Sequence, residues 1–211
     1  MSRGTFIVLE GPDGSGKSTQ AALLVKALAE RGLAVDHLRD PGGTPVGDAI
    51  RGILLGPSAV HRAAETFLFL ASRAQLVAER VRPALDAGRV VVCERFTLST
   101  VVYQGCATEI ASDPAAMERL RASVALSADG IAPDLLVVLD VSPEEGLGRK
   151  AGGPGGPDRI ERKGAAYQAR VREGYLAEAR RLTGAVVVPP GTPEETRRRV
   201  LAAAEGVLGG R

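Results

Sequence analysis

The sequence predicts a three-layer α/β domain in which a five-stranded parallel sheet is flanked by helices. Three observations support this fold class. First, five short apolar runs rich in β-branched residues are spread along the chain. Second, longer segments with helical patterns separate these runs. Third, breakers or charged residues bound each run. Such alternation of strands and helices implies βαβ crossovers, which build a parallel sheet with a helical layer on each face.

The expected strands are the apolar runs themselves. Each run is continuous rather than alternating, as parallel strands are when helices cover both of their faces. The five strands are expected at Thr5–Leu9, Ala34–Leu38, Val90–Cys93, Leu135–Leu139 and Ala185–Val188.

The helices are expected between and after these strands. Gly32 and Gly88 stand just beyond two of the helical patterns, where a left-handed cap is favoured. The expected helices are Ser18–Arg31, Val46–Leu55, Ala63–Leu85, Pro114–Ser127, Pro143–Arg149, Ala165–Thr183 and Pro193–Leu208.

One stretch, Ala151-Gly-Gly-Pro-Gly-Gly-Pro157, interrupts the pattern and cannot be helical. It could link two domains, but only about 50 residues follow it, too few for a typical second domain. We therefore interpret residues 1–211 as one domain with a surface loop at this point.

Composition excludes several classes of function. The 27 basic and 25 acidic side chains give a net charge of +2, which exerts no overall attraction toward nucleic acid or membrane. The run Arg197–Arg199 has Glu194 and Glu195 nearby and is interpreted as a solvated helix face. The two histidines are far apart and the two cysteines show no ligand-like spacing, which argues against a zinc site. Two cysteines form no disulfide framework, and a cytoplasmic location is expected.

The strongest motif is Gly11-Pro-Asp-Gly-Ser-Gly-Lys-Ser18, which matches the phosphate-binding P-loop at every fixed position. An apolar strand precedes it and a helix follows, so backbone N–H groups and the helix N-terminus would face phosphate oxygens. Lys17 would neutralise the β- and γ-phosphates of ATP, and the Ser18 hydroxyl would ligate Mg²⁺. A glycine-rich turn with a chance lysine is the alternative. The expected ATP site comprises Gly11, Pro12, Asp13, Gly14, Ser15, Gly16, Lys17, Ser18 and Thr19.

The P-loop alone does not distinguish kinases from GTPases, motors and switches, although no Asn-Lys-x-Asp guanine-reading sequence is present. Along nearly the whole chain the sequence resembles thymidylate kinases, in five segments that keep the family's order. The segments are Glu10–Ser18, Arg39-Asp-Pro-Gly-Gly-Thr44, Phe69-Leu-Ala-Ser-Arg73, Glu94-Arg-Phe with Ser99–Gly105, and Pro133–Val141 with Asp158-Arg-Ile-Glu161. The resemblance implies a P-loop kinase that transfers the γ-phosphoryl group of ATP to dTMP, giving dTDP and ADP.

The resemblance also implies residues for the acceptor phosphate and sugar. Asp13 would approach the 3′-hydroxyl and phosphate region, Arg51 would hold the phosphate, and Arg39 would support it from a strand end. Arg95 would clamp the transferring phosphoryl group, and Glu94 would join Ser18 at the metal. The alternatives are a capping carboxylate for Asp13, an exposed helical arginine for Arg51, and a structural ion pair for Arg95. Asp140 also ends a strand, but a structural role is preferred for it.

For the base, the resemblance implies that Phe69 stacks on thymine while Arg73, on the same helix face, hydrogen-bonds its carbonyl oxygen. The spacing of Thr100, Tyr103 and Gln104 puts them on one helical face. In the family, Thr100 would read the base edge, Tyr103 would exclude a 2′-hydroxyl, and Gln104 would meet the polar edge of the nucleotide. A core role is the alternative for Phe69, and core or cap roles are the alternatives for Thr100, Tyr103 and Gln104.

The family's mobile lid falls at about 149–163, over the glycine–proline stretch. Some members carry a basic residue within the P-loop, where this chain has Gly14, so the lid is expected to supply the positive charge. The possible sources are Arg149, Lys150, Arg159 and Arg162, of which Arg149 and Arg159 occupy the most comparable positions. The expected catalytic residues are thus Lys17, Arg95, Asp13, Arg149 and Arg159.

Four departures from the family pattern bear on specificity. Asp40 replaces the usual Glu, and Glu94 replaces the usual Asp; both could face the Mg²⁺ region. The segment Gln104–Glu109 lacks a Gly-Arg-Gly turn, the lid lacks arginines in its middle, and Phe96 replaces Tyr or His. A kinase for another deoxynucleoside monophosphate or an analogue therefore remains open, as does a non-catalytic nucleotide-binding protein. The family is commonly dimeric, which implies a homodimer.

Overall fold

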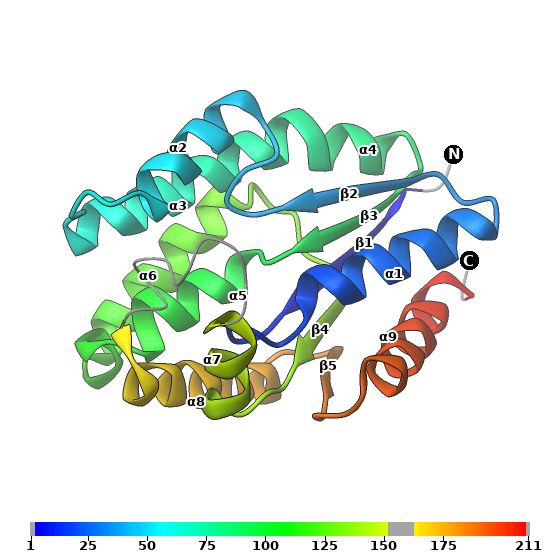
Figure 1. Ribbon diagram of the computed structural model, residues 1–211. Coiled ribbons are helices and arrows are strands. Elements are labelled where there is room, and N and C mark those ends of the chain that lie inside the picture. Colours follow the sequence, from blue (N-terminus) through cyan, green and yellow to red (C-terminus); the bar gives the residue numbers. More distant parts are fainter. Residues whose placement is uncertain (1–2, 152–162, 210–211) are drawn as a thin grey trace.

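The computed structural model describes residues 3–151 and 163–209, and its centre is a five-stranded parallel sheet (Figure 1). The strand order is β2-β3-β1-β4-β5, so the first strand in the chain lies in the middle. The strands are β1 (Thr5–Glu10), β2 (Val35–Arg39), β3 (Val90–Glu94), β4 (Leu135–Leu139) and β5 (Ala185–Val188). All four neighbouring pairs are parallel, which confirms the fold class expected from the sequence.

The three central strands are buried and the two edge strands are not. Every residue of β1 and β4 is buried, whereas β5 exposes Val186 and Val187. On the other edge, His37 of β2 is exposed. Side chains of β2 and β5 nevertheless pack into the hydrophobic clusters on both faces of the sheet, as expected for strands that helices cover on both faces. An edge strand has a paired neighbour on one side only, so flanking helices cover it less completely.

Helices cover the sheet on both faces (Figure 1). On one face, α1 (Lys17–Glu30) and α9 (Pro193–Leu208) pack Leu24, Leu28 and Val200 against alternate strand residues. On the other face lies α8 (Ala165–Arg181), together with a long helix. That helix begins as α3 (Arg62–Leu76), passes through the π-helical turn η1 (Val77–Val81) and ends as α4 (Arg82–Asp86). Together the three parts form the single helix expected at 63–85.

The remaining helices surround the carboxyl edge of the sheet. They are α2 (Pro45–Leu55), α6 (Pro114–Ser127) and α7 (Pro143–Ala151), all close to the expected bounds. The list of expected helices omitted α5 (Thr97–Thr100), the π-helical segment η2 (Val101–Cys106) and a 3₁₀ turn η3 (Glu109–Ser112). Cys106 is the last residue of η2.

The ends of helices follow the expected chemistry. Gly32 and Gly88 have positive φ values of 80° and 74°, as left-handed caps require. Thr192 begins α9 with a capping box, in which its hydroxyl accepts from the Glu195 N–H and the Glu195 carboxylate accepts from the Thr192 N–H. Within the described residues, no helix is both long and apolar enough to cross a membrane.

The two cysteines lie at different depths. Cys93, on β3, is fully buried and pairs in register with Val8 of β1 and Leu38 of β2. Burial raises the pKa of its thiol well above the ordinary value. Cys106 is half-buried, and both thiols are free.

Candidate active site

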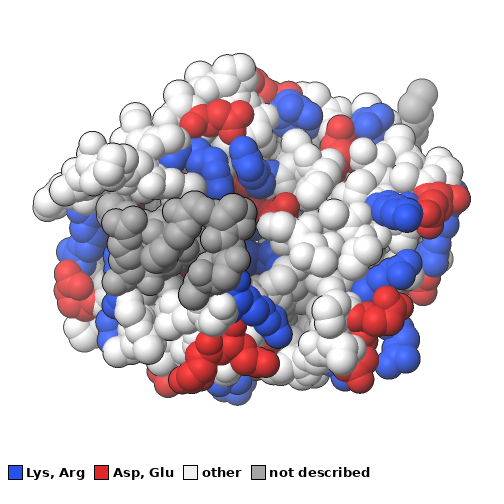
Figure 2. All heavy atoms as spheres, viewed as in Figure 1, with Lys and Arg blue, Asp and Glu red and all other residues white. Residues whose placement is uncertain are grey.

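A cavity of about 430 Å³ opens at the carboxyl ends of β1, β2 and β3, where parallel sheets place their ligands. Figure 2 shows blue Lys and Arg side chains gathered near the middle of this face. The residues predicted from the sequence that line the cavity are Asp13, Gly14, Gly16, Lys17, Ser18, Thr19, Arg39, Arg51, Phe69, Arg73, Glu94, Arg95, Thr100, Tyr103, Gln104 and Arg149. Gly11, Pro12 and Ser15 do not line it, but they belong to the loop beneath. Arg159 and Arg162 lie outside the described residues.

The phosphate loop connects β1 to α1 through two glycines with positive φ, Gly11 at 139° and Gly16 at 89°. A Cβ atom on Gly11 would lie 2.4 Å from the Leu139 carbonyl oxygen, so the loop can follow this path only with glycine there. The Lys17 ammonium donates to the carbonyl oxygens of Gly11 and Pro12 at 2.8 and 2.7 Å. The lysine thus lies over the loop, at the N-terminus of α1, where anions are favoured.

A hydroxyl and a carboxylate meet beside this loop. Ser18 Oγ donates to Glu94 Oε2 at 2.5 Å, and His37 Nε2 lies 3.0 Å from Glu94 Oε1. Burial opposes ionisation of Glu94, but the hydrogen bonds from His37 and Ser18 outweigh it and lower its pKa. In the described part of the chain, no group of three His, Cys, Asp or Glu side chains could hold a metal. Two oxygen ligands fit Mg²⁺, which keeps several waters and binds largely through substrate phosphates.

Arg95 follows β3 and holds an unusual backbone conformation, with φ at 65°. Its Nη2 atom donates to Asp13 Oδ1 in the phosphate loop, and its guanidinium carbon lies 5.0 Å from the centre of the Tyr103 ring. The Tyr103 hydroxyl donates to the other oxygen of Asp13 at 3.0 Å. The three side chains therefore form one unit at the centre of the cavity.

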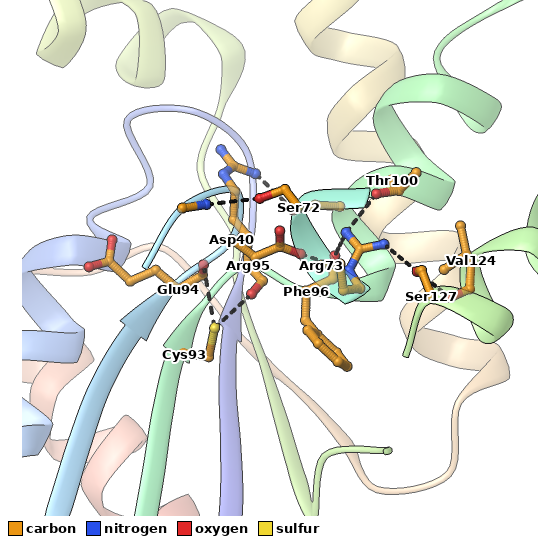
Figure 3. Close-up of polar contacts among 12 residues, drawn as sticks. Asp40, Ser72, Arg73, Cys93, Glu94, Arg95, Phe96, Thr100, Val124 and Ser127 are labelled. Atoms are coloured by element: carbon orange, nitrogen blue, oxygen red, sulfur yellow. Dashed lines mark hydrogen bonds and ion pairs between the residues drawn. The ribbon is translucent and has the colours of Figure 1, made fainter. Parts of the chain in front are cut away.

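Arg73 lies at the bottom of the cavity and is 1% exposed. Its Nε atom donates to Asp40 Oδ2 at 2.7 Å, and its Nη2 atom donates to Thr100 Oγ1 at 2.7 Å and to the Phe96 carbonyl at 3.0 Å. Figure 3 shows the guanidinium between Asp40 and the helical residues Thr100 and Ser127. The Asp40 carboxylate is equally buried, and burial raises its pKa while Arg73 opposes the rise.

The structure gives different partners to Asp40 and Glu94, the two acidic residues whose length departs from the family pattern. Glu94 bonds to Ser18 beside the phosphate loop, whereas Asp40 is bound to Arg73. Both carboxylates line the same cavity, and the interpretation in which both face the Mg²⁺ region stays a prediction. The second oxygen of Asp40, Oδ1, has no hydrogen-bond partner among the described residues.

The other residues predicted to bind the acceptor nucleotide line the cavity from different elements of the fold. Phe69 is partly buried against the core and still lines the cavity. Arg51, from α2, donates to the Pro41 carbonyl at 3.1 Å, while the half-exposed Arg39 lies 3.7 Å from Asp48. Gln104 is buried on η2 and is tied at 3.1 Å to the buried carboxylate of Glu65.

Helix α7 approaches the phosphate loop so closely that both sides require glycine. A Cβ on Gly14 would lie 2.2 Å from the Gly146 carbonyl oxygen, and a Cβ on Gly146 would lie 2.5 Å from the Asp13 carbonyl oxygen. One turn further on, Arg149 donates to the Gly14 carbonyl at 3.2 Å and reaches the cavity. The space that a side chain at position 14 would need is thus occupied by the backbone of α7.

Sequence reasoning missed several residues that support the site. Ser99 lines the cavity, and Glu10 and Tyr175 lie directly behind Arg95. Glu10 was quoted only as the first residue of the motif, and the pattern of α8 marks Tyr175 as an ordinary core residue. Asp140 pairs with Arg172 of α8 at 2.7 and 2.8 Å, which agrees with the structural role preferred for it.

A family model, related sequences and a solved structure that match this chain are all described as thymidylate kinases. The family model for thymidylate kinase matches residues 9–198. A thymidylate kinase of Deinococcus radiodurans is 42% identical over 177 residues, covering 83% of each protein. One of Pelotomaculum thermopropionicum is 43% identical over 210 residues, covering 98% of this chain and 95% of the relative. The crystal structure of thymidylate kinase from Ehrlichia chaffeensis superposes with a TM-score of 0.75 at 26% identity, covering 96% of this chain and 99% of that one.

Proposed function

The chain belongs to the thymidylate kinase family, and we propose that its cavity transfers the γ-phosphoryl group of ATP to dTMP, giving dTDP and ADP. One observation carries the proposal. The phosphate loop and the side chains suited to a second nucleotide line the same cavity, with Arg95 between them. A protein that only bound ATP would have no use for the second set.

We propose that ATP binds along the phosphate loop. The ammonium of Lys17, now 2.7–2.8 Å from two loop carbonyls, would turn toward the β- and γ-phosphates. Ser18 and Glu94 would hold Mg²⁺, which supplies positive charge against the transferring phosphoryl group. Backbone N–H groups of residues 14–19 and the start of α1 add fixed partial charge.

The opposite side of the cavity would hold dTMP. The buried guanidinium of Arg73 already meets Thr100 and would offer a donor to a thymine carbonyl, while Phe69 stacks on the ring. Tyr103 would close the space beside the sugar C2′ and so favour deoxynucleotides. The acceptor phosphate would lie near Arg51 and Arg95, with Arg39 at the entrance.

The reaction then requires positioning more than covalent chemistry. A phosphate oxygen of dTMP attacks the γ-phosphorus, the bond from phosphorus to the β,γ-bridging oxygen breaks, and ADP leaves. Because the attacking oxygen is already ionised at neutral pH, no strong general base is needed. Arg95 and Lys17 would stabilise the negative charge on the three equatorial oxygens.

We propose that residues 149–163 form a lid that closes over ATP and excludes water. The Arg149 side chain, which already contacts the phosphate loop, supports this assignment; Arg159 lies outside the described residues and is proposed from the family resemblance alone. Replacing Arg149 and Arg159 by alanine should reduce turnover steeply while dTMP binding, measured by calorimetry, stays nearly unchanged. Turnover within a factor of a few of the parent protein would refute the lid assignment.

The function itself is tested by coupled ADP release across a panel of nucleoside monophosphates. We expect the highest kcat/KM with dTMP and a marked loss with ribonucleotides. Good activity with another deoxynucleotide and little with dTMP would assign a different acceptor. Binding of ATP without any transfer would favour a non-catalytic nucleotide-binding protein.

Two further properties belong to the proposal. Exposed apolar side chains lie on three neighbouring helices, with Ile53 on α2, Phe67 on α3 and Leu126 on α6. We propose that this face forms a homodimer, so that Phe67→Glu should convert a dimer to a monomer in analytical ultracentrifugation; a monomeric parent protein would refute it.

The two free thiols, Cys93 and Cys106, suit a reducing cytoplasm, which we propose as the location.

A further inference from the structure

The carboxylate of Glu10 is fully buried at the end of β1 and accepts four hydrogen bonds. Two come from the backbone N–H groups of Phe96 and Ser99, at 2.8 and 3.0 Å. The other two come from the hydroxyls of Ser99 and Tyr175, at 2.6 and 3.0 Å. A buried charge needs such partners, and here they also fix the start of α5.

The same two hydroxyls also face Arg95. Its Nη1 atom donates to Ser99 Oγ and to Tyr175 Oη, each at 3.0 Å. Among the contacts of the described residues, Glu10 and Arg95 form no direct ion pair within 4 Å. The two opposite charges are therefore joined through neutral hydroxyls, each of which accepts from Arg95 and contacts Glu10, and which lie 2.8 Å from each other.

This arrangement fixes Nη1 through neutral hydroxyls, while Nη2 of the same guanidinium pairs with the Asp13 carboxylate. A carboxylate in contact with Nη1 would compete with a substrate phosphate for the charge of Arg95. A hydroxyl fixes the direction of the Nη1–H bond without adding a second carboxylate to the one that Asp13 already places on Nη2. Tyr175 suits this task because its ring is 0% exposed and packs edge-on against Tyr103, with ring centres 6.1 Å apart.

We propose that Tyr175 is a positioning residue for phosphoryl transfer. Its hydroxyl bridges Arg95 Nη1 and the Glu10 carboxylate, and so holds the Arg95 guanidinium in place at the centre of the cavity. The inference rests on the proposed function. It also ties α8, the helix that follows residues 152–162, to the reacting groups. The Arg172–Asp140 ion pair anchors the same helix to the end of β4.

The test compares two tyrosines of α8. In Tyr175→Phe the ring stays and the Tyr175 bridge between Arg95 and Glu10 is lost, while the Ser99 bridge remains. In the control, Tyr167→Phe, the hydroxyl of another buried tyrosine is lost, which donates to the backbone carbonyl of Tyr103 at 2.9 Å. Both variants should lower Tm by a similar few degrees. Only Tyr175→Phe should lower kcat, by about 10–100-fold, as expected for losing a hydrogen bond to a charged group. Its KM for ATP should change less than about twofold.

A double-variant cycle separates positioning from general packing. If Tyr175 acts through Arg95, adding Tyr175→Phe to Arg95→Ala should reduce kcat little further. Full, additive losses would overturn the proposal, as would a Tyr175→Phe variant with the kcat of Tyr167→Phe. The parent protein reports separately on the function: if it phosphorylates no nucleotide, the proposed function fails, whereas an active parent with a silent Tyr175→Phe variant refutes only this inference.

Discussion

Substitution of Gly146 by alanine tests whether α7 must lie against the phosphate loop. The new Cβ would lie 2.5 Å from the Asp13 carbonyl oxygen, whereas ordinary contacts begin at 3.4 Å. The helix and the loop must therefore separate by about 1 Å. A displacement of that size can reduce the rate of a positioned reaction by about 100-fold, or about 2.7 kcal/mol of transition-state stabilisation. We expect kcat to fall by roughly this factor, because Asp13 and Arg149 both move.

The matched control is Gly148→Ala, on the same helix and two residues away. A Cβ there meets no atom within 4 Å, so the change should only improve helix propensity, by up to about 1 kcal/mol. Steady-state kinetics with both substrates and thermal unfolding are measured for each variant. If Gly146→Ala retains the kcat of Gly148→Ala, the close contact does not constrain the loop and the reasoning is wrong.

Three further predictions concern stability. Arg73→Leu leaves the buried Asp40 carboxylate unpaired and should cost about 3–5 kcal/mol in urea unfolding, most of which an added Asp40→Leu should restore. The folded protein lowers the pKa of Glu94 below its ordinary value of 4.5, so ionised Glu94 stabilises the fold above that pH. This stabilisation is lost as the pH falls through the pKa of the folded state. In Glu94→Gln, Tm should therefore depend less on pH between 3 and 5. Thr192→Ala removes the capping box of α9 and should cost about 1 kcal/mol, and an unchanged urea midpoint would contradict that.

The sequence predicted the regular part of the fold closely because its pattern is strong there. All five strands were placed within a residue or two, since each is a short apolar run between breakers. The segment Thr97–Cys106 was not among the expected helices, although the spacing of Thr100, Tyr103 and Gln104 had suggested a helical face. It is rich in β-branched residues and contains glycine, which disfavour helix, and packing against α6 and α8 stabilises it instead.

The site was predictable where a motif fixes the backbone and not where tertiary contacts choose the partner. The phosphate loop follows from its glycines and from its place between a strand and a helix. The choice of Arg73 as the partner of Asp40, and of Ser18 as the partner of Glu94, depends on which residues the sheet edge and α3 bring together. The role of Tyr175 could not be read from its helix, because 80 positions separate it from Arg95.

The depth of Cys93 gives the protein an internal reporter of unfolding. A thiol reagent can alkylate this side chain only after β3 separates from β1 and β2, so its labelling rate follows the population of opened molecules. Cys106, half-buried at the end of η2, should be labelled earlier and gives an internal reference for reagent strength. Since a ligand that binds only the folded state reduces the open population by a factor of 1 + [L]/Kd, mass spectrometry of Cys93 labelling would yield nucleotide affinities without any turnover.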